Sequence, residues 1–270
     1  MSWNAYKLAL LREMGLTAWV RRDGVPTAEE ADVQLRPAPA PVQDEAVAAP
    51  DAPWLPEPSP AAAVSVQGRR AGGVASMDWP ALRQAVASCT ACKLCKGRRQ
   101  TVFGIGAERA AWMIVGEAPG EQEDLKGEPF VGPAGKLLDQ MLLAIGLARE
   151  PGAPNGQVYI ANVLKCRPPH NRNPEPEEIA QCEPFLRRQI ELVQPRIILA
   201  MGRFAVQTLL QSQEAIGRLR GRVHRYQGIP VVVTYHPAYL LRNLPDKAKA
   251  WEDLCLAVHQ LGQERRATEV

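Results

Sequence analysis

Five of the six cysteines in this chain are spaced in a way that suits metal binding. Cys89, Cys92 and Cys95 lie within CTACKLC, and Cys166 and Cys182 flank the segment RPPHNRNPEPEEIAQ. A C-x-x-C pair together with two distant cysteines can give four thiolates to one metal ion or to one iron–sulfur cluster. Spacing alone does not distinguish zinc from iron–sulfur. The competing interpretation is a set of ordinary buried thiols.

Other candidate residues directly follow short apolar segments. GEAPG follows AAWMIV, NVLKC includes the end of VYIANVL, MGR follows RIILA, and HPA follows PVVVTY. Glycines in the first motif let backbone approach a ligand closely, and its amides can bind oxygen atoms. The asparagine and the histidine of these motifs also lie at the ends of predicted strands, although either residue more often has a structural role in a loop.

These motifs need a scaffold that brings them together. The apolar segments 110–116, 158–164, 196–202 and 230–236 are predicted strands, and the segments 132–146, 176–193, 203–210 and 246–261 are predicted helices. Continuously apolar strands that alternate with helices indicate a parallel sheet covered on both faces. We therefore expect a three-layer α/β/α sandwich with a central four-stranded parallel sheet. Ligands bind beyond the carboxyl ends of such strands, where all four motifs would meet. Cys255 is expected on the buried face of the last helix.

The chain is predicted to have four parts: a short amphipathic peptide at 1–22, an Ala/Pro-rich linker at 23–77, a globular domain at 78–262 and a tail at 263–270. The linker contains RPAPAPVQDEAVAAPDAPWLPEPSPAAAV, which cannot bury enough apolar surface to offset the entropy of ordering it. Eight acidic residues and one arginine lie between residues 23 and 67, so the globular part is basic although the whole chain carries only +3. A basic domain suits a partner that bears phosphate.

Several classes of protein are disfavoured by the sequence. No segment approaches the roughly 20 apolar residues of a membrane-spanning helix. Arg12 and Glu13 interrupt the N-terminal segment before a signal-peptide core could form. We expect a cytoplasmic monomer with no membrane association.

The motifs GEAPGEQED, GEPFVGPAGKLLD, NVLKCRPPHNRNPEPEE, GRFAVQTLL and HPAYLLRN occur in this order. Together they resemble the family 4 uracil-DNA glycosylases, the iron–sulfur branch of that superfamily, over about residues 78–261. The resemblance implies a 4Fe–4S cluster and hydrolysis of the N-glycosidic bond of uracil in single- or double-stranded DNA, which leaves an abasic site. It assigns the cluster to Cys89, Cys92, Cys166 and Cys182, with Cys95 beside it. A structural role without redox chemistry is expected for the cluster.

The resemblance also implies a pocket for a flipped-out base. Its members would be Gly116, Glu117, Ala118, Phe130, Asn162 and His236. Phe130 would stack on the uracil ring. The Asn162 amide would donate to O4 and accept from N3–H, which is the reverse of what cytosine presents. His236 would bind O2 as negative charge develops on the leaving base, in either protonation state.

Activation of the attacking water is less well defined by the motifs. The better-known branch of the superfamily has an aspartate at the position of Ala118, where it positions the water. Glu123 and Glu117 are the candidate carboxylates here, and together with His236 they form the predicted catalytic set. The alternative to an enzyme is a non-enzymatic module in which the metal site organises a DNA-binding surface.

The segment HPAYLLRN carries the predicted contact with the DNA stack. In the resemblance, Leu240 or Leu241 fills the space that the flipped base vacates, and Arg242 holds a flanking phosphate. Lys165 and Arg167 are predicted to face phosphate as well. Arg172 and Arg203 also flank the ends of the predicted strands and belong to the same expectation.

The N-terminal peptide has a separate resemblance. LLREMGLTAWVRR is similar to the N-terminal peptide of the psi subunit of the bacterial DNA polymerase III clamp loader. This implies that residues 3–22 could dock on the replisome through Leu11, Met14, Leu16 and Trp19. The alternative is an amphipathic tail without a partner.

Overall fold

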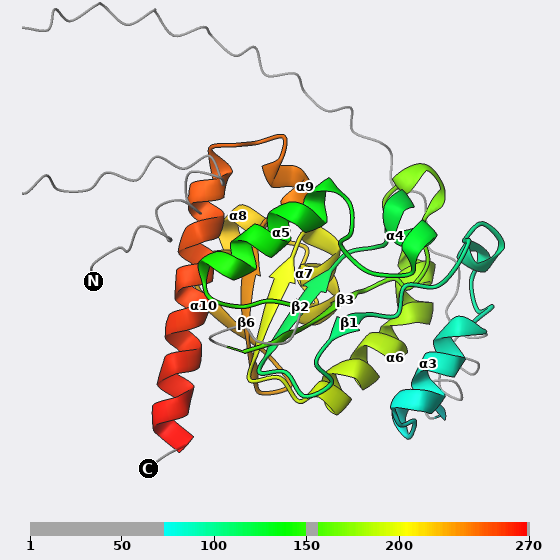
Figure 1. Cartoon of the computed structure of the whole chain (residues 1–270), viewed down its shortest axis with the longest axis horizontal. Coiled ribbons are helices and arrows are strands. Elements are labelled where there is room, and N and C mark those ends of the chain that lie inside the picture. Colours follow the sequence, from blue (N-terminus) through cyan, green and yellow to red (C-terminus); the bar gives the residue numbers. More distant parts are fainter. Residues whose placement is uncertain (1–72, 150–155, 269–270) are drawn as a thin grey trace, which may run out of the picture.

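The computed structural model of the protein describes residues 73–149 and 156–268, with helices on both faces of a central sheet (Figure 1). The peptide 1–22 and the linker as far as residue 72 lie outside the described residues, so the predictions for them stay predictions. In the described part of the chain, none of the helices has the length and apolar character needed to cross a membrane.

The sheet has six strands in the order β1-β3-β2-β4-β6-β5. Their bounds are β1 Ile105–Gly106, β2 Trp112–Gly116, β3 Val158–Asn162, β4 Ile197–Met201, β5 Val223–Tyr226 and β6 Ile229–Thr234. The four central strands are parallel, as predicted, whereas β1 and β5 pair antiparallel at the two edges. The edge strands were missed because β1 has two residues and β5 is only half-buried.

Ten helical segments surround this sheet within the described residues. They are α3 Trp79–Ala87, η1 Lys93–Lys96, α4 Glu121–Lys126, α5 Pro133–Ala144, η2 Pro169–Asn171, α6 Pro176–Val193, α7 Arg203–Leu210, α8 Ile216–Leu219, α9 Pro237–Leu240 and α10 Asp246–Thr268. Helices α5 and α10 cover one face of the sheet, and α6 and α7 cover the other. Because β2, β3 and β4 are buried on both faces, their apolar runs show no alternation.

The two ends of the globular part differ from the prediction. Val74 is buried against Leu82 of α3 and Phe185 of α6, so the packed structure includes residues from Gly73 onward that had been placed in the linker. At the other end, α10 continues to Thr268 rather than stopping before a tail at 263. Cys255 on this helix is exposed, and its predicted burial is wrong.

Candidate active site

The carboxyl ends of the parallel strands meet at one edge of the sheet. Gly116 at the end of β2 is in register with Asn162 at the end of β3. The chain keeps this pairing beyond the strands, because the Leu164 amide donates to the Glu117 carbonyl over 3.0 Å. On the other side, the Gly202 amide donates to the Thr234 carbonyl, two residues before His236. The sequence motifs after these strands are therefore brought together, as predicted.

Phe130, Asn162 and His236 converge around Gly116. The rings of Phe130 and His236 stack, with centroids 5.4 Å apart and planes at 27°. A Cβ atom on Gly116 would stand 2.4 Å from Asn162 Oδ1 and 2.5 Å from Phe130 Cζ, so both side chains lie directly against the glycine backbone. Only glycine permits this approach.

Asn162 carries an unusual polar atom. The residue is 2% exposed, and its side-chain Oδ1 is buried without a hydrogen-bond partner in the structure. A buried acceptor without a donor costs about 1–3 kcal/mol relative to a satisfied one. The backbone carbonyl of the same residue is satisfied, since it accepts from Lys165 Nζ over 2.7 Å. The site thus presents one fixed, unused acceptor that a donor on a bound molecule would satisfy.

His236 is held as a neutral imidazole. Burial lowers its pKa to about 4; the nearby Arg242 acts in the same direction, and the Glu123 carboxylate opposes the shift. Its Nδ1 accepts a hydrogen bond from the Ala238 amide over 3.2 Å at the start of α9. With Nδ1 acting as an acceptor, the proton of the neutral ring resides on Nε2. His236 is therefore a neutral N–H donor at neutral pH.

Two carboxyl groups were predicted to be catalytic, and they have different surroundings. Glu117 lines the cavity beside His236, and its Oε1 accepts from the Phe204 amide at the start of α7 over 3.1 Å. Burial raises the pKa of Glu117, and hydrogen bonds from the backbone of Phe204 and Arg203 oppose this shift. Glu123 instead accepts from the amides of Gly120, Val131 and Gly132 at 2.9–3.0 Å. Three backbone donors occupy both oxygens of Glu123.

A cavity of about 950 Å³ opens next to this cluster. Glu117, Ala118 and His236 are among its lining residues, whereas Phe130 and Asn162 are buried and are not among them. Three arginines also line the cavity: Arg172, Arg203 and Arg242. The Arg203 guanidinium lies over the Phe204 ring at 5.5 Å. This combination of size and positive lining suits a phosphodiester strand better than a small neutral molecule.

The two leucines of the predicted wedge are separated by packing. Leu240 is 1% exposed and belongs to the core, so its assignment to a DNA wedge is wrong. Leu241 is 41% exposed and begins a turn whose Arg242 and Asn243 amides both donate to the Tyr239 carbonyl. Of the two leucines, Leu241 is therefore the exposed candidate, and its role as a wedge stays a prediction.

The structure also corrects one of the predicted phosphate contacts. Lys165 is 1% exposed, and its ammonium group donates to the Asn162 carbonyl and to Gln189 Oε1 over 2.7 and 2.6 Å. Burial lowers the pKa of Lys165 to about 7. The lysine faces the interior because α6 covers it, which a local sequence pattern does not reveal. Arg167 remains at the surface, where it contacts Asn171 and Glu121.

Five cysteines gather between α3, the loop after β3 and α6. None of them forms a disulfide, and each lies within electrostatic reach of others in the group. Burial raises the pKa of Cys182 to about 12. Two cations adjoin the group: Arg98 donates to Cys166 Sγ over 3.1 Å, and the buried Lys165 lies close to Cys166 and Cys182. Among the residues described, no set of three or more His, Cys, Asp or Glu side chains has the arrangement of a single-ion site.

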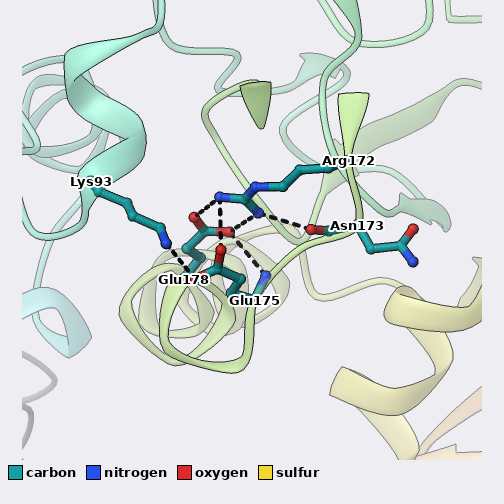
Figure 2. A network of polar contacts seen from close by, with 5 residues as sticks. All are labelled: Lys93, Arg172, Asn173, Glu175 and Glu178. Carbon is teal, nitrogen blue, oxygen red and sulfur yellow. Dashed lines mark hydrogen bonds and ion pairs between the residues drawn. The ribbon is translucent and has the colours of Figure 1, made fainter. Parts of the chain in front are cut away.

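Little in the sequence indicates a polar network that joins Lys93, Arg172, Glu175 and Glu178 (Figure 2). Arg172, which lines the cavity, binds both carboxylate oxygens of the buried Glu178. Glu178 also caps α6 through the Glu175 amide, and Glu175 forms an ion pair with Lys93 in η1. The signal available in the sequence was the pair of glutamates three residues apart around the start of a helix. Lys93 had no such signal, because its partner lies 82 residues away.

Comparisons with known proteins agree with this geometry. Residues 103–255 match a family model described as the uracil DNA glycosylase superfamily. Over 164 residues the chain is 47% identical to a type-4 uracil-DNA glycosylase of Archaeoglobus fulgidus, which covers 58% of this chain and 79% of the relative. It is 45% identical over 160 residues to a type-4 uracil-DNA glycosylase of Thermotoga maritima, which covers 58% of this chain and 80% of the relative. A type-5 uracil-DNA glycosylase of Pyrobaculum aerophilum is 34% identical over 149 residues, and the match covers 51% of this chain and 66% of the relative.

Proposed function

This chain belongs to the uracil DNA glycosylase superfamily, and we propose that it hydrolyses the N-glycosidic bond of uracil in DNA and leaves an abasic site. The observation that carries the proposal is the unused Oδ1 of Asn162 in a closed, buried setting. Uracil has a donor at N3, whereas cytosine has an acceptor there. A fixed acceptor therefore favours uracil and repels cytosine.

The departing base is stabilised by His236. Bond cleavage places negative charge on uracil O2, and the Nε2–H of a neutral imidazole can donate to that oxygen. Burial, which keeps the pKa of His236 at about 4, also strengthens this hydrogen bond by excluding water. The proton stays on the histidine, so uracil leaves as an anion.

The sugar is left with cationic character, and Glu117 is our candidate for the carboxylate that stabilises this charge. Glu117 lines the cavity and is fixed by the Phe204 amide, so its carboxylate can face the sugar and orient a water molecule. Glu123 is engaged by three backbone amides, and we assign it to positioning instead of water activation.

The DNA strand would lie along the cavity. We assign its flanking phosphates to Arg203 and Arg242, while Arg172 is held by Glu178. Leu241 would enter the stack in place of the flipped base, because it is the exposed leucine of the turn. Phe130 would provide the aromatic face for uracil. Both single- and double-stranded DNA containing uracil are expected as substrates.

Cys89, Cys92, Cys166 and Cys182 would hold a 4Fe–4S cluster. The donor set fits such a group: the thiols converge without disulfides, and Arg98 and Lys165 supply positive charge beside them. A four-iron cluster spaces its thiolates more widely than one ion does, so the lack of a single-ion arrangement among the described residues is compatible with it. When bound, the cluster would act as a cross-link between α3, the loop after β3 and α6.

The test is uracil release from an oligonucleotide with one uracil. Incubation with the protein followed by alkali should break the strand at that site, while the cytosine-containing oligonucleotide should stay intact. The variant Asn162→Ala should reduce strand breakage strongly. If the protein binds the oligonucleotide but alkali produces no break, the chain is the non-enzymatic DNA-binding module.

Docking of residues 3–22 on a clamp loader is a separate proposal that only the sequence pattern supports. Retention of the wild-type peptide, and not of a Trp19→Ala peptide, by the clamp-loader core would support it. Failure of the wild-type peptide to be retained would end it.

A further inference from the structure

Phe130 has a backbone conformation that needs support from elsewhere in the fold. Its φ angle is 56°, in the left-handed region that costs a non-glycine residue about 1–2 kcal/mol. The residue is buried, and its carbonyl oxygen lies against Gly135 of α5, where a Cβ atom would stand at 1.8 Å. This conformation directs the Phe130 ring onto His236 and Gly116.

A single arginine holds the carbonyl side of this turn. Arg149 donates from Nη1 to the Pro129 carbonyl and from Nη2 to the Phe130 carbonyl, both over 3.0 Å. Its Nε donates to Asp139 of α5 over 2.8 Å, which fixes the orientation of the guanidinium plane. The Arg149 side chain is 13% exposed, so these contacts are largely shielded from water.

The amide side of the same turn is held by an anion. Glu123 accepts from the amides of Val131 and Gly132, the two residues that follow Phe130. A cation therefore binds two successive carbonyls, and a carboxylate binds the next two amides. Charge-assisted bonds of this kind are stronger than bonds between neutral groups, and the forked guanidinium is suited to two acceptors at once.

We propose that Arg149 is a positioning residue for base binding: with Glu123 it clamps residues 129–132 so that Phe130 faces the flipped uracil. This inference rests on the proposed function, and Arg149 itself touches neither the base nor the sugar. Its role is to remove the need for Phe130 to find its conformation when DNA binds. Preorganisation of this kind increases the fraction of DNA encounters in which the base is bound productively, without adding a new contact to the base.

The experiment compares kcat/KM for uracil release by wild type, Arg149→Ala, Arg149→Lys, Phe130→Ala and the double variant Phe130→Ala/Arg149→Ala. Loss of base stacking by Phe130→Ala should lower kcat/KM about 5- to 150-fold, which corresponds to about 1–3 kcal/mol. Arg149→Ala should lower it about fivefold or more, but by no more than Phe130→Ala does, because its effect passes through Phe130. The kcat/KM of Arg149→Lys should lie between those of wild type and Arg149→Ala, because an ammonium group cannot bind two carbonyls and Asp139 in one plane.

The decisive readout is the double variant. If Arg149 acts through Phe130, removing Arg149 from the Phe130→Ala protein should change kcat/KM less than about twofold. The matched control is Arg188→Ala, since Arg188 also binds a backbone carbonyl and a carboxylate, those of Met77 and Glu191. That control should keep wild-type kcat/KM.

Uracil release by wild type and Arg188→Ala establishes the proposed function independently of the clamp. Equal kcat/KM for Arg149→Ala and wild type, or an effect of Arg149→Ala above about twofold in the Phe130→Ala protein, would overturn the clamp alone. Thermal denaturation shows whether Arg149→Ala folds. If it does not, Arg149→Lys takes its place, alone and combined with Phe130→Ala, and wild-type kcat/KM for Arg149→Lys would likewise overturn the inference.

Discussion

At the residue scale, we propose that the choice of base depends on which hydrogen-bonding groups Asn162 presents. The side chain is closed off from water, so no solvent molecule can compensate for a mismatched partner. Sites built around buried hydrogen bonds reject the wrong partner far more strongly than apolar pockets do. Selectivity for uracil over cytosine can therefore reside in one amide held at the end of a strand.

The substitution Asn162→Asp should change this preference. A carboxyl group in a buried site has a raised pKa and is protonated, so it can donate to N3 of cytosine and accept from its N4 amino group. We expect uracil release to fall at least about 100-fold and cytosine release to become detectable. Base release from paired oligonucleotides that differ only in U or C measures both rates. Unchanged uracil release by this variant would contradict the role given to Asn162.

The protonation state of His236 makes a second prediction at this scale. Because burial lowers its pKa to about 4, the imidazole stays neutral from pH 8 down to about pH 5. The single-turnover rate should be flat over that range as far as His236 is concerned and should change only as the pH approaches 4. His236→Ala should lower the rate about 100- to 1,000-fold at every pH in the range. A wild-type rate that rises tenfold per unit between pH 8 and 6 would instead indicate a cationic histidine.

At the scale of elements, the turn between α9 and α10 is where we propose that the protein meets duplex DNA. The Tyr239 carbonyl accepts from two amides of the turn. The phenolic hydroxyl of Tyr239 donates to Asp246 Oδ2 over 2.7 Å at the start of α10. The turn is therefore fixed at both ends. A rigid turn can hold Leu241 exposed without letting it fold back onto the core.

Leu241→Ala should thus separate duplex from single-stranded substrates. A duplex has a stack that closes when the base leaves, whereas a single strand has no paired stack to refill. We expect uracil release from duplex to fall about tenfold and release from single strands to change about twofold or less. Leu125→Ala on α4 is the matched control, because Leu125 has the same 41% exposure. Equal losses on both substrates would argue against a wedge.

At the scale of the whole molecule, cysteines from parts of the chain that lie far apart in sequence come close together. Cys89 follows α3, Cys166 follows β3, and Cys182 lies within α6. The network of Lys93, Glu175, Glu178 and Arg172 runs from the same region to the cavity (Figure 2). Loss of a cluster at this place should therefore loosen the fold and also disturb the surface that faces DNA.

Cys182→Ser and Cys95→Ser should behave differently. Cys182 is buried among the thiols, so its replacement should abolish bound iron and sulfide and lower the melting temperature by more than about 5 °C. Cys95→Ser should keep the bound iron and sulfide and the melting temperature of wild type, since the four proposed ligands remain. Iron and sulfide content, visible absorption and thermal denaturation measure this difference. Loss of iron from Cys95→Ser would show that the ligand set has been assigned incorrectly.

The sequence by itself determined the sheet core and the site that adjoins it. Continuous apolar runs such as that of β2 report burial on both faces, and the carboxyl ends of parallel strands must share one edge. The convergence of Glu117, Asn162 and His236 followed from that geometry. These are local patterns that can be read from the sequence without knowing how the elements pack.

Only the tertiary structure decided which side of a turn or helix each neighbouring residue occupies. Leu240 is in the core and Leu241 is exposed because α9 packs against α5, and Lys165 is buried because α6 covers it. Arg149 supports Phe130 across 19 residues of chain. Contacts of this kind depend on how elements lie against one another, and a linear pattern records each element's own periodicity but not its neighbours.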